Sequence, residues 1–379
     1  MPSEESPLTS SVTALRFYKS RDLRVEEVAP LPCGPNDVRI KIAFCGICGS
    51  DLLEYQSGPI FPPAEGKIIA HTGVKLPVTL GHEFSGTVIE LGSNVQNLSL
   101  GQAVAVNPAC DHRHYDSPPC SPCNSGHYNL CDATATHGLS APGGGFSQET
   151  VVNSINCLPL PDNISLRTAA LIEPLAVAQH CVSESGFVKG QTVMICGAGP
   201  IGLALISILR VAGASKIIVT EILDQRRDKA QNLGADTAIN PLQKGADGSP
   251  GSTESALASV RQVVNDGVDI AFDATGVQST LDLAIASTKA HGTIFNVAIH
   301  KQALSLNVNS LTFKEKKLLT GICYLQRDFE AVIKMLADGS LDAEGLITSV
   351  IPLSRVIEDG FEELINNRDH HVKILVQPN

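Results

Sequence analysis

The sequence has no tryptophan and few aromatic residues of any kind. Its 379 residues include 5 Tyr and 11 Phe, so aromatic side chains make up 4 % of the chain. Hydrophobic residues nevertheless make up 43 %, which excludes global disorder and allows large cores that must be mainly aliphatic. A chain of this length predicts two domains.

Positive charge and long apolar runs are also scarce. Lys and Arg number 28 against 39 Asp and Glu, a net charge of -11. An acidic chain suits the phosphate backbone poorly, so we expect no nucleic-acid partner. The longest apolar stretch, 201–214, contains Arg210 and is too short to cross a membrane. The polar segment 1–11 has the pattern of neither a signal nor a transit peptide, so we expect a cytoplasmic protein.

Cysteine, in contrast, is abundant, with eleven residues. Without a secretory signal, closely spaced cysteines indicate a metal site more often than disulfides. Four of them fall in one loop that is rich in Pro, Gly and His: Cys110, Cys120, Cys123 and Cys131. Four thiolates in a closed tetrahedron suit structural zinc, with free thiols or two disulfides as the alternatives. Three histidines in this loop are interpreted as surface side chains rather than ligands: His112, His114 and His127.

A second region carries a glycine motif between a strand pattern and a helix pattern. The apolar run 192–196 is followed by G-x-G-x-x-G at Gly197, Gly199 and Gly202. In this context the glycines predict a tight turn, close approach of a pyrophosphate, and packing of the helix on the strand. Pro200 and Ile201 open the helix, whose N-terminal N–H groups would bind the pyrophosphate. A glycine turn without a ligand is the alternative.

The residue that follows the next predicted strand indicates which dinucleotide binds. Glu221 lies about where an acid accepts hydrogen bonds from the adenosine ribose and disfavours a 2′-phosphate. We therefore expect NAD rather than NADP. Arg226 and Arg227 keep the alternative open, because an Arg nearby can accept a phosphate. Strands and helices that alternate through this region predict a doubly wound parallel sheet.

A further set of metal-ligand residue types is spread over the chain. Cys48, His82, Glu83 and Glu173 combine a thiol, an imidazole and two carboxyl groups. Such a mixed set, with one open position, suits a catalytic zinc. Because these residues lie far apart in sequence, the pattern alone favours a buried His82 and a capping Glu83 instead.

Taken together, these segments resemble the zinc-containing medium-chain alcohol dehydrogenase family. The resemblance spans 14–378 and is carried by four segments besides the cysteine loop and the glycine motif: 46–55, 76–86, 173–177 and 372–378. Within the family it is greatest for the branch of butanediol and sorbitol dehydrogenases. It implies a Rossmann-type domain over 176–313 and a mainly β, GroES-like catalytic domain over 1–175 and 314–379.

The resemblance also implies roles for single residues. Cys48, His82 and Glu173 correspond to catalytic-zinc ligands. Glu83 corresponds to an acid that ligates or approaches the metal, and we expect it, like Ser50, to act in catalysis. Ser50 corresponds to the hydroxyl that takes the alcohol proton onward. The four loop cysteines correspond to a structural-zinc set with a longer first spacing. In the cofactor site, Arg226 would flank the adenine, Val297 would face the nicotinamide amide, and Thr275 is expected to line the same site.

Two departures from the family pattern bear on the substrate. Leu53 stands where relatives carry the His that ends the proton relay, and 321–324 lack the Arg with which sorbitol dehydrogenases contact a polyol. No Arg occurs there before Arg327. The prediction is therefore an NAD-dependent zinc oxidoreductase that interconverts a small vicinal diol and its hydroxyketone. The alternatives are a polyol or other secondary-alcohol dehydrogenase, an inactive dinucleotide-binding protein, and a zinc-binding interaction module. By resemblance we expect a homo-oligomer, dimer or tetramer, with a small-molecule substrate and no membrane partner.

Overall fold

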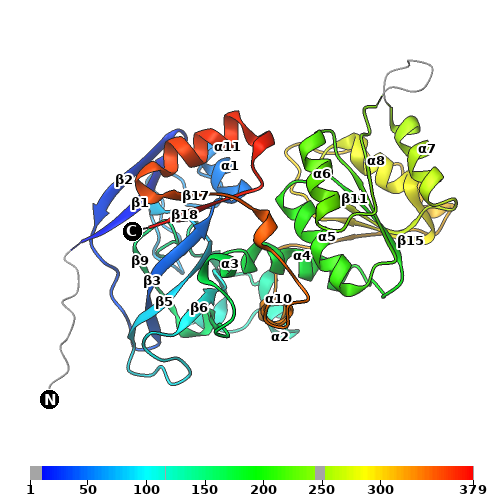
Figure 1. The fold of residues 1–379 in the computed structure, drawn as a ribbon. Helices are drawn as coiled ribbons and strands as arrows, with labels where there is room; N and C mark the ends of the chain where they lie inside the picture. The colour runs from blue at the N-terminus through cyan, green and yellow to red at the C-terminus, as the bar shows by residue number, and fades with distance from the viewer. Residues whose placement is uncertain (1–10, 116, 244–251, 379) are drawn as a thin grey trace. The chain divides into compact units, whose positions relative to one another are not determined.

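The chain divides into two compact units. The computed structural model describes residues 11–115, 117–243 and 252–378, so most of the polar segment at 1–11 lies outside the described residues. The first unit comprises Met1–Glu173 and Ile347–Asn379, and the second comprises Pro174–Leu346 (Figure 1). In the described part of the chain, no helix has the length and apolar character needed to cross a membrane.

The first unit is built mainly of β-strands. A three-stranded sheet has the order β2-β1-β4, and a larger seven-stranded sheet has the order β10-β6-β5-β3-β18-β17, with β9 paired to β3. The strands of the two sheets are β1 (Val12–Lys19), β2 (Asp22–Val28), β3 (Asp37–Gly46), β4 (Val78–Thr79), β5 (Glu83–Leu91), β6 (Ala103–Val106), β9 (Glu149–Asn153), β10 (Cys157–Pro159), β17 (Ile347–Pro352) and β18 (Lys373–Gln377). This architecture confirms the predicted GroES-like fold.

Strands from the two ends of the chain meet in the larger sheet. The C-terminal strand β18 pairs antiparallel with β3, with Leu375 opposite Gly46 and Val376 opposite Cys45 (Figure 1). On its other side β3 pairs with β5, where Gly46 lies opposite Glu83. Since β3 lies between them, the starts of β5 and β18 are both brought to the end of β3 at Gly46.

The core of the first unit is largely aliphatic, as the composition predicts. Val38, Ile40 and Ile42 on β3 are all buried and belong to one cluster with side chains from β5, β6 and β18. Four fully buried phenylalanines also belong to it: Phe17, Phe84, Phe146 and Phe361. Several of the few aromatic residues of the sequence thus fill the core between the β-strands.

The second unit is a parallel sheet with helices, which confirms the predicted doubly wound fold. Its six strands have the order β13-β12-β11-β14-β15-β16. These strands are β11 (Thr192–Cys196), β12 (Lys216–Thr220), β13 (Thr237–Ile239), β14 (Val268–Asp273), β15 (Thr288–Asn296) and β16 (Lys317–Thr320). The main helices are α4 (Ile172–Glu184), α5 (Pro200–Ala212), α6 (Asp224–Asn232), α7 (Thr253–Val263), α8 (Gln278–Ser287) and α10 (Gln326–Ala337). The strand order reverses direction at β11, where ligands bind in such sheets.

The return of the chain to the first unit comes later than residue 314. β16 pairs with β15, with Leu318 opposite Ile294, and therefore completes the parallel sheet. The first unit resumes only at Ile347, with β17. All four residues of β16 are exposed, and its sequence, Lys-Leu-Leu-Thr, does not alternate apolar and polar residues. The sequence pattern therefore does not indicate a strand there.

Candidate functional site

The N-terminus of a short helix positions three of the site residues. Helix α1 (Gly49–Ser57) begins immediately after Cys48, which is its N-cap residue. Asp51 is fully buried, and its Oδ2 accepts a hydrogen bond from the backbone N–H of Cys48 at 2.9 Å. Ser50 lies between them in the first turn, so one capping interaction fixes the thiol, the hydroxyl and the carboxylate together.

His82 precedes β5 and faces this helix turn. Its Nε2 lies 3.0 Å from the Ser50 Oγ, and its Nδ1 lies 3.5 Å from the Asp51 Oδ1. The distance between the His82 Nδ1 and the Asp51 Oδ1 exceeds that of an ordinary hydrogen bond. Both atoms are buried, and neither has a hydrogen-bond partner among the described residues. Burial alone would lower the pKa of His82, but Asp51 and Cys48 raise it well above its ordinary value. The negative groups around the imidazole therefore favour a positive charge at this position, which in the absence of a metal ion is the protonated ring.

Glu83 and Lys373 form a buried ion pair next to this site. The Lys373 Nζ donates to both carboxylate oxygens of Glu83 at 2.7 Å and to the Ile47 carbonyl at 3.1 Å. Burial disfavours a charged amine, but Glu83 and then Cys48 raise the pKa of Lys373 above its ordinary value. Both oxygens of Glu83 are thus engaged by Lys373. The sequence prediction did not include Lys373 or Asp51, because only the pairing of β18 with β3 and the capping of α1 place them here.

Glu173 approaches the same group of residues from α4. It lies in the first turn of that helix, is 8 % exposed, and interacts electrostatically with Lys373. Cys48, His82 and Glu173 are therefore neighbours, although His82 Nε2 is hydrogen-bonded to Ser50 and the three do not form a closed set of ligand atoms. A thiol, an imidazole and a carboxylate suit zinc with an open position. The Cys48 thiol beside the imidazole and the buried Glu173 carboxylate fit such an ion.

The cysteine loop contains a more compact set of ligand groups. Cys120 caps α2 (Ser121–Asn124), Cys123 lies within that helix, and Cys131 follows the 3₁₀ turn η2 (Tyr128–Leu130). The Cys120 and Cys123 sulfurs are 3.4 Å apart. Within the described residues, one group of three ligand-type side chains has all its ligand atoms within 4.8 Å of one another: His112, Cys123 and Cys131. All eleven cysteines are free thiols, so the alternative of two disulfides is not the arrangement seen.

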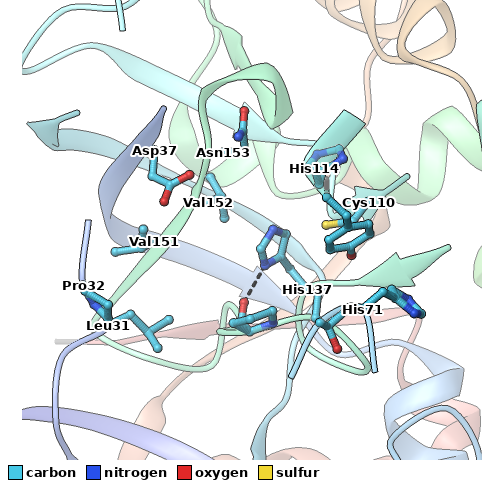
Figure 2. A pocket seen from close by; sticks show the side chains of 14 residues that line it. Leu31, Pro32, Asp37, His71, Cys110, His114, His137, Val151, Val152 and Asn153 are labelled. Atoms are coloured by element: carbon cyan, nitrogen blue, oxygen red, sulfur yellow. Dashed lines mark hydrogen bonds between the residues drawn. The ribbon is translucent and has the colours of Figure 1, made fainter. Parts of the chain in front are cut away.

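Cys110 lies apart from this group. It sits in β7 (Ala109–Cys110), which pairs with β8 (Ala135–Thr136), and its side chain lines a cavity of about 340 Å³. Figure 2 shows Cys110 beside His114 at one side of this cavity, with His71 and His137 also on the wall. Burial raises the pKa of the Cys110 thiol to about 12. The structure thus gathers three of the four predicted cysteines and adds His112, which the sequence interpretation placed on the surface.

The glycine motif of the second unit has the geometry of a dinucleotide turn. Gly197, directly after β11, has φ +94°, a conformation that L side chains rarely adopt. Gly199 is the N-cap of α5, and a Cβ built on it meets no atom within 4 Å. A Cβ on Gly202 would lie 2.0 Å from the Gly197 carbonyl oxygen, so only glycine lets α5 pack this closely on the turn. Pro200 and Ile201 are the first residues of α5.

The other predicted cofactor residues surround the carboxyl ends of the strands. Glu221 follows β12, and its two carboxylate oxygens accept hydrogen bonds from the Ala198 and Leu223 backbone N–H groups at 2.9 and 3.0 Å. Thr275 Oγ1 donates to Asp273, and its methyl group would lie 2.6 Å from a Cβ on Gly197. Val297 follows β15 and Arg226 lies in the first half of α6. Glu221 and Thr275 therefore adjoin the glycine turn, which fits a dinucleotide.

The segment that differs from the polyol-specific pattern provides no free Arg. Arg327 is the first Arg after Gly321, and its Nη2 pairs with Glu184 Oε1 at 3.1 Å on the exposed side of α10 and α4. Leu53, in α1, is half-buried and cannot carry a proton. The structure therefore places no unpaired Arg next to 321–324 from within that segment of the described chain, and it places Leu53 in the helix that carries Ser50.

Comparison with known proteins identifies relatives along nearly the whole chain. A family model described as zinc-binding dehydrogenase matches 200–338, and one described as alcohol dehydrogenase GroES-like domain matches 34–162. The chain is 36 % identical over 383 residues to the (R,R)-butanediol dehydrogenase of Saccharomyces cerevisiae, covering 97 % of this chain and 98 % of that protein. It is 32 % identical over 345 residues to a D-xylulose reductase A of Aspergillus niger, with 89 % of each covered. The crystal structure of 2R,3R-butanediol dehydrogenase from Bacillus subtilis matches with a TM-score of 0.87 and 36 % identity, covering 97 % of this chain and 100 % of that one.

Proposed function

The chain belongs to the zinc-containing medium-chain alcohol dehydrogenase family, in the branch of the butanediol dehydrogenases, and on this basis we propose that it interconverts a small vicinal diol and its hydroxyketone with NAD. The observation that carries the proposal is the convergence of Cys48, Ser50 and His82 at the start of α1. A thiol and an imidazole that suit zinc lie there beside a hydroxyl that suits an alcohol proton.

In the proposed reaction each residue has a separate task. Cys48, His82 and Glu173 would hold zinc, which as a Lewis acid lowers the pKa of the substrate hydroxyl. Ser50 accepts the alcohol proton through its Oγ and passes it on, while the hydride from the carbinol carbon goes to NAD. Asp51 faces the His82 Nδ1 and thereby orients the imidazole, as carboxylates behind zinc-binding histidines do.

We propose that Glu83 stays in its ion pair and does not ligate the metal. Each of its oxygens is 2.7 Å from the Lys373 Nζ. Leaving this pair would strand a buried ammonium group, which costs several kcal/mol. Glu83 and Lys373 are therefore positioning residues whose charges balance beside the ligands.

NAD is the proposed dinucleotide because Glu221 occupies the turn after β12. Its carboxylate is oriented by two backbone N–H groups and adjoins the glycine turn. Arg227, which would otherwise favour a 2′-phosphate, donates to the Glu221 carbonyl at 2.7 Å and pairs with Asp224. The acid is thus better placed than Arg227 to decide the choice of cofactor.

A small diol is the proposed substrate because nothing in 321–324 provides a guanidinium for a polyol. Arg327 is engaged with Glu184, and the similarity to butanediol dehydrogenases, at 36 to 37 %, exceeds that to the D-xylulose reductase, at 32 %. A polyol dehydrogenase is the second candidate function, favoured by that same relative.

We further propose a homo-oligomer that works in the cytoplasm. β16 is an exposed edge strand of the parallel sheet, and Leu318 and Leu319 are each 36 % exposed. An edge with apolar side chains suits pairing with a second copy of the chain. The eleven free thiols suit a reducing compartment.

The direct test is an assay of NADH absorbance across substrates. The purified chain is given the 2,3-butanediol stereoisomers, acetoin, sorbitol, xylitol and simple alcohols, each with NAD and with NADP. We expect kcat/KM to be highest for a 2,3-butanediol stereoisomer with NAD. A preference for sorbitol or xylitol would replace the diol proposal by the polyol one, and binding of NADH without turnover of any substrate would support the inactive dinucleotide-binding alternative.

A further inference from the structure

We propose that the metal in the cysteine loop is held by three thiolates and one imidazole, those of Cys120, Cys123, Cys131 and His112, and that Cys110 is not a ligand. This inference rests on the proposed function only in that the family implies a zinc ion in this loop. It assigns a ligand set specific to this chain, in which a histidine takes the place expected for a fourth cysteine.

The positions of the ligand atoms carry the inference. In a tetrahedral site with Zn–S bonds of about 2.3 Å, neighbouring sulfurs lie about 3.8 Å apart. The Cys120 and Cys123 sulfurs are 3.4 Å apart, and the ligand atoms of His112, Cys123 and Cys131 all lie within 4.8 Å of one another. Four side chains of the types that bind zinc are therefore gathered in this loop.

The loop holds His112 in place beside Cys131. His112 opens the 3₁₀ turn η1 (His112–His114), whose N-cap Asp111 accepts from the Arg113 backbone N–H at 3.0 Å. The imidazole stacks on the Tyr128 ring, with centroids 6.0 Å apart and planes at 20°. Since Tyr128 begins the turn η2 that leads directly to Cys131, this stacking couples the imidazole to the third thiol.

One ring nitrogen of His112, the buried Nδ1, makes no hydrogen bond among the described residues, and the Asp111 Oδ1 lies 3.7 Å from it. His114, by contrast, is fully used: its Nδ1 accepts from the Asp111 backbone N–H at 3.0 Å, and its Nε2 lies 2.8 Å from the Asn156 Oδ1. His127 is exposed. Of the three histidines in the loop, His112 alone combines proximity to the thiols with a nitrogen that makes no hydrogen bond among the described residues.

Cys110 has the surroundings of a small apolar side chain. It packs in a cluster with Ala135, Ala141 and Tyr115, and Figure 2 shows its sulfur at the wall of the cavity described above. Its sulfur lies 3.9 Å from the Pro108 carbonyl and interacts with the Tyr115 side chain. Buried free cysteines commonly pack in this way.

The test compares metal content and the absorption spectrum of the Co(II)-substituted full-length chain. The variants are Cys110→Ala, His112→Ala and His112→Cys, with His114→Ala as the matched control from the same turn. Cys110→Ala and His114→Ala should keep two zinc ions per chain after dialysis, whereas His112→Ala should fall to one. His112→Cys should keep two and shift the Co(II) ligand-field bands towards those of a four-thiolate site.

Loss of one zinc in Cys110→Ala together with retention in His112→Ala would overturn the inference. So would a His112→Cys variant whose Co(II) spectrum matches the wild type, or a wild-type loop that binds no zinc. These readouts do not use turnover, so a chain without diol activity would contradict the proposed function while the metal counts still decide the ligand set.

Discussion

At the scale of single residues, the Glu83–Lys373 pair is the interaction that joins the two ends of the first unit at the site. Gly46 provides the space for it, because a Cβ there would lie 2.1 Å from the Glu83 Oε2. Both partners are buried, at 1 % and 4 % side-chain exposure. Removing one of them leaves a buried charge unpaired, which costs more than the pair itself contributes.

Lys373→Met should therefore destabilise the first unit strongly. We expect its free energy of unfolding in urea to fall by about 3–5 kcal/mol, the usual cost of an unpaired buried charge. The double variant Glu83→Gln with Lys373→Met should recover a large part of this loss, because no charge remains. Lys41→Met, at an exposed position on β3, is the control and should be neutral. A neutral Lys373→Met would contradict the ion-pair assignment.

His137 provides a pH-dependent contribution to stability. It lies on the cavity of Figure 2, its Nδ1 is 2.6 Å from the Pro142 carbonyl, and burial lowers its pKa from 6.5 to about 4. Between these values the unfolded chain binds a proton that the folded chain does not, so stability falls as the pH drops from 6.5 to 4. The full effect is about 3 kcal/mol.

The variant His137→Gln should lack this part of the pH dependence. Urea unfolding of both chains from pH 7 to pH 4 measures it, with His127→Gln, at an exposed position, as the control. We expect the wild type and the control to lose the same stability and His137→Gln to lose about 3 kcal/mol less. Parallel curves for all three chains would show that His137 does not titrate in the expected range.

At the scale of secondary-structure elements, two glycines of one motif have separable tasks. Gly199 faces open space, whereas Gly202 packs against the turn at Gly197. Gly199→Ala should leave the thermal stability of the second unit unchanged but weaken NADH binding at least about tenfold, since its methyl group would occupy the path of the pyrophosphate. Calorimetry and fluorescence titration measure the two effects.

Gly202→Ala is the matched comparison for this prediction. Its Cβ would lie 2.0 Å from a backbone oxygen, so α5 must move, and we expect both the melting temperature and NADH binding to fall. Overpacking of this kind costs about 1–3 kcal/mol. Unchanged NADH binding in Gly199→Ala would argue against a dinucleotide at this turn.

The elements that the sequence predicted well are those whose requirements are local. The glycine turn needs a strand before it, a helix after it and glycines at fixed offsets, and all of these can be seen in a few residues. Lys373 and Asp51 were missed for different reasons. Lys373 reaches Glu83 only through strand pairing across the whole first unit, while Asp51 acts through the cap of α1, which composition and spacing do not distinguish from an ordinary acidic first turn.

For the cysteine loop, spacing and the proposed ligand set differ in the fourth ligand. Spacing predicts Cys110 as the fourth thiolate, whereas we propose His112, because in the structure Cys110 packs with Ala135 and Ala141. A histidine two residues later is brought to the thiols by a stacked tyrosine. Neither effect has a signature in the sequence, because both depend on contacts between separate turns.

At the scale of the whole molecule, the family resemblance predicted both folds and their discontinuous order along the chain. It could not place the point of return, because β16 is short and lacks the buried apolar residues that mark the other strands of the sheet. Among the described residues, β16 pairs with a strand on one side only, so it forms an edge of the parallel sheet. Leu318 and Leu319 on this edge are partly open to solvent. In the proposed homo-oligomer this edge contacts a second copy.

The double variant Leu318→Lys with Leu319→Lys should therefore shift the oligomer towards monomers, because Lys on an edge strand discourages pairing. Sedimentation velocity measures the change. Leu100→Lys, at a position 65 % exposed in the first unit, is the control and should leave the oligomer intact. A variant that sediments as the wild type does would place the contact between copies elsewhere.

The central claim is that a zinc site built on Cys48 oxidises a vicinal diol with NAD. The most direct test measures NADH formation from 2,3-butanediol by the wild type, by Cys48→Ser and by Cys33→Ser, a control at a half-buried cysteine, together with the Kd for NADH of each. We predict that Cys48→Ser loses turnover by at least about a thousandfold, equivalent to about 4 kcal/mol in activation free energy, while its Kd for NADH and the turnover of Cys33→Ser remain those of the wild type. Undiminished turnover in Cys48→Ser, or no NADH from any butanediol stereoisomer with the zinc-loaded wild type, would contradict the account.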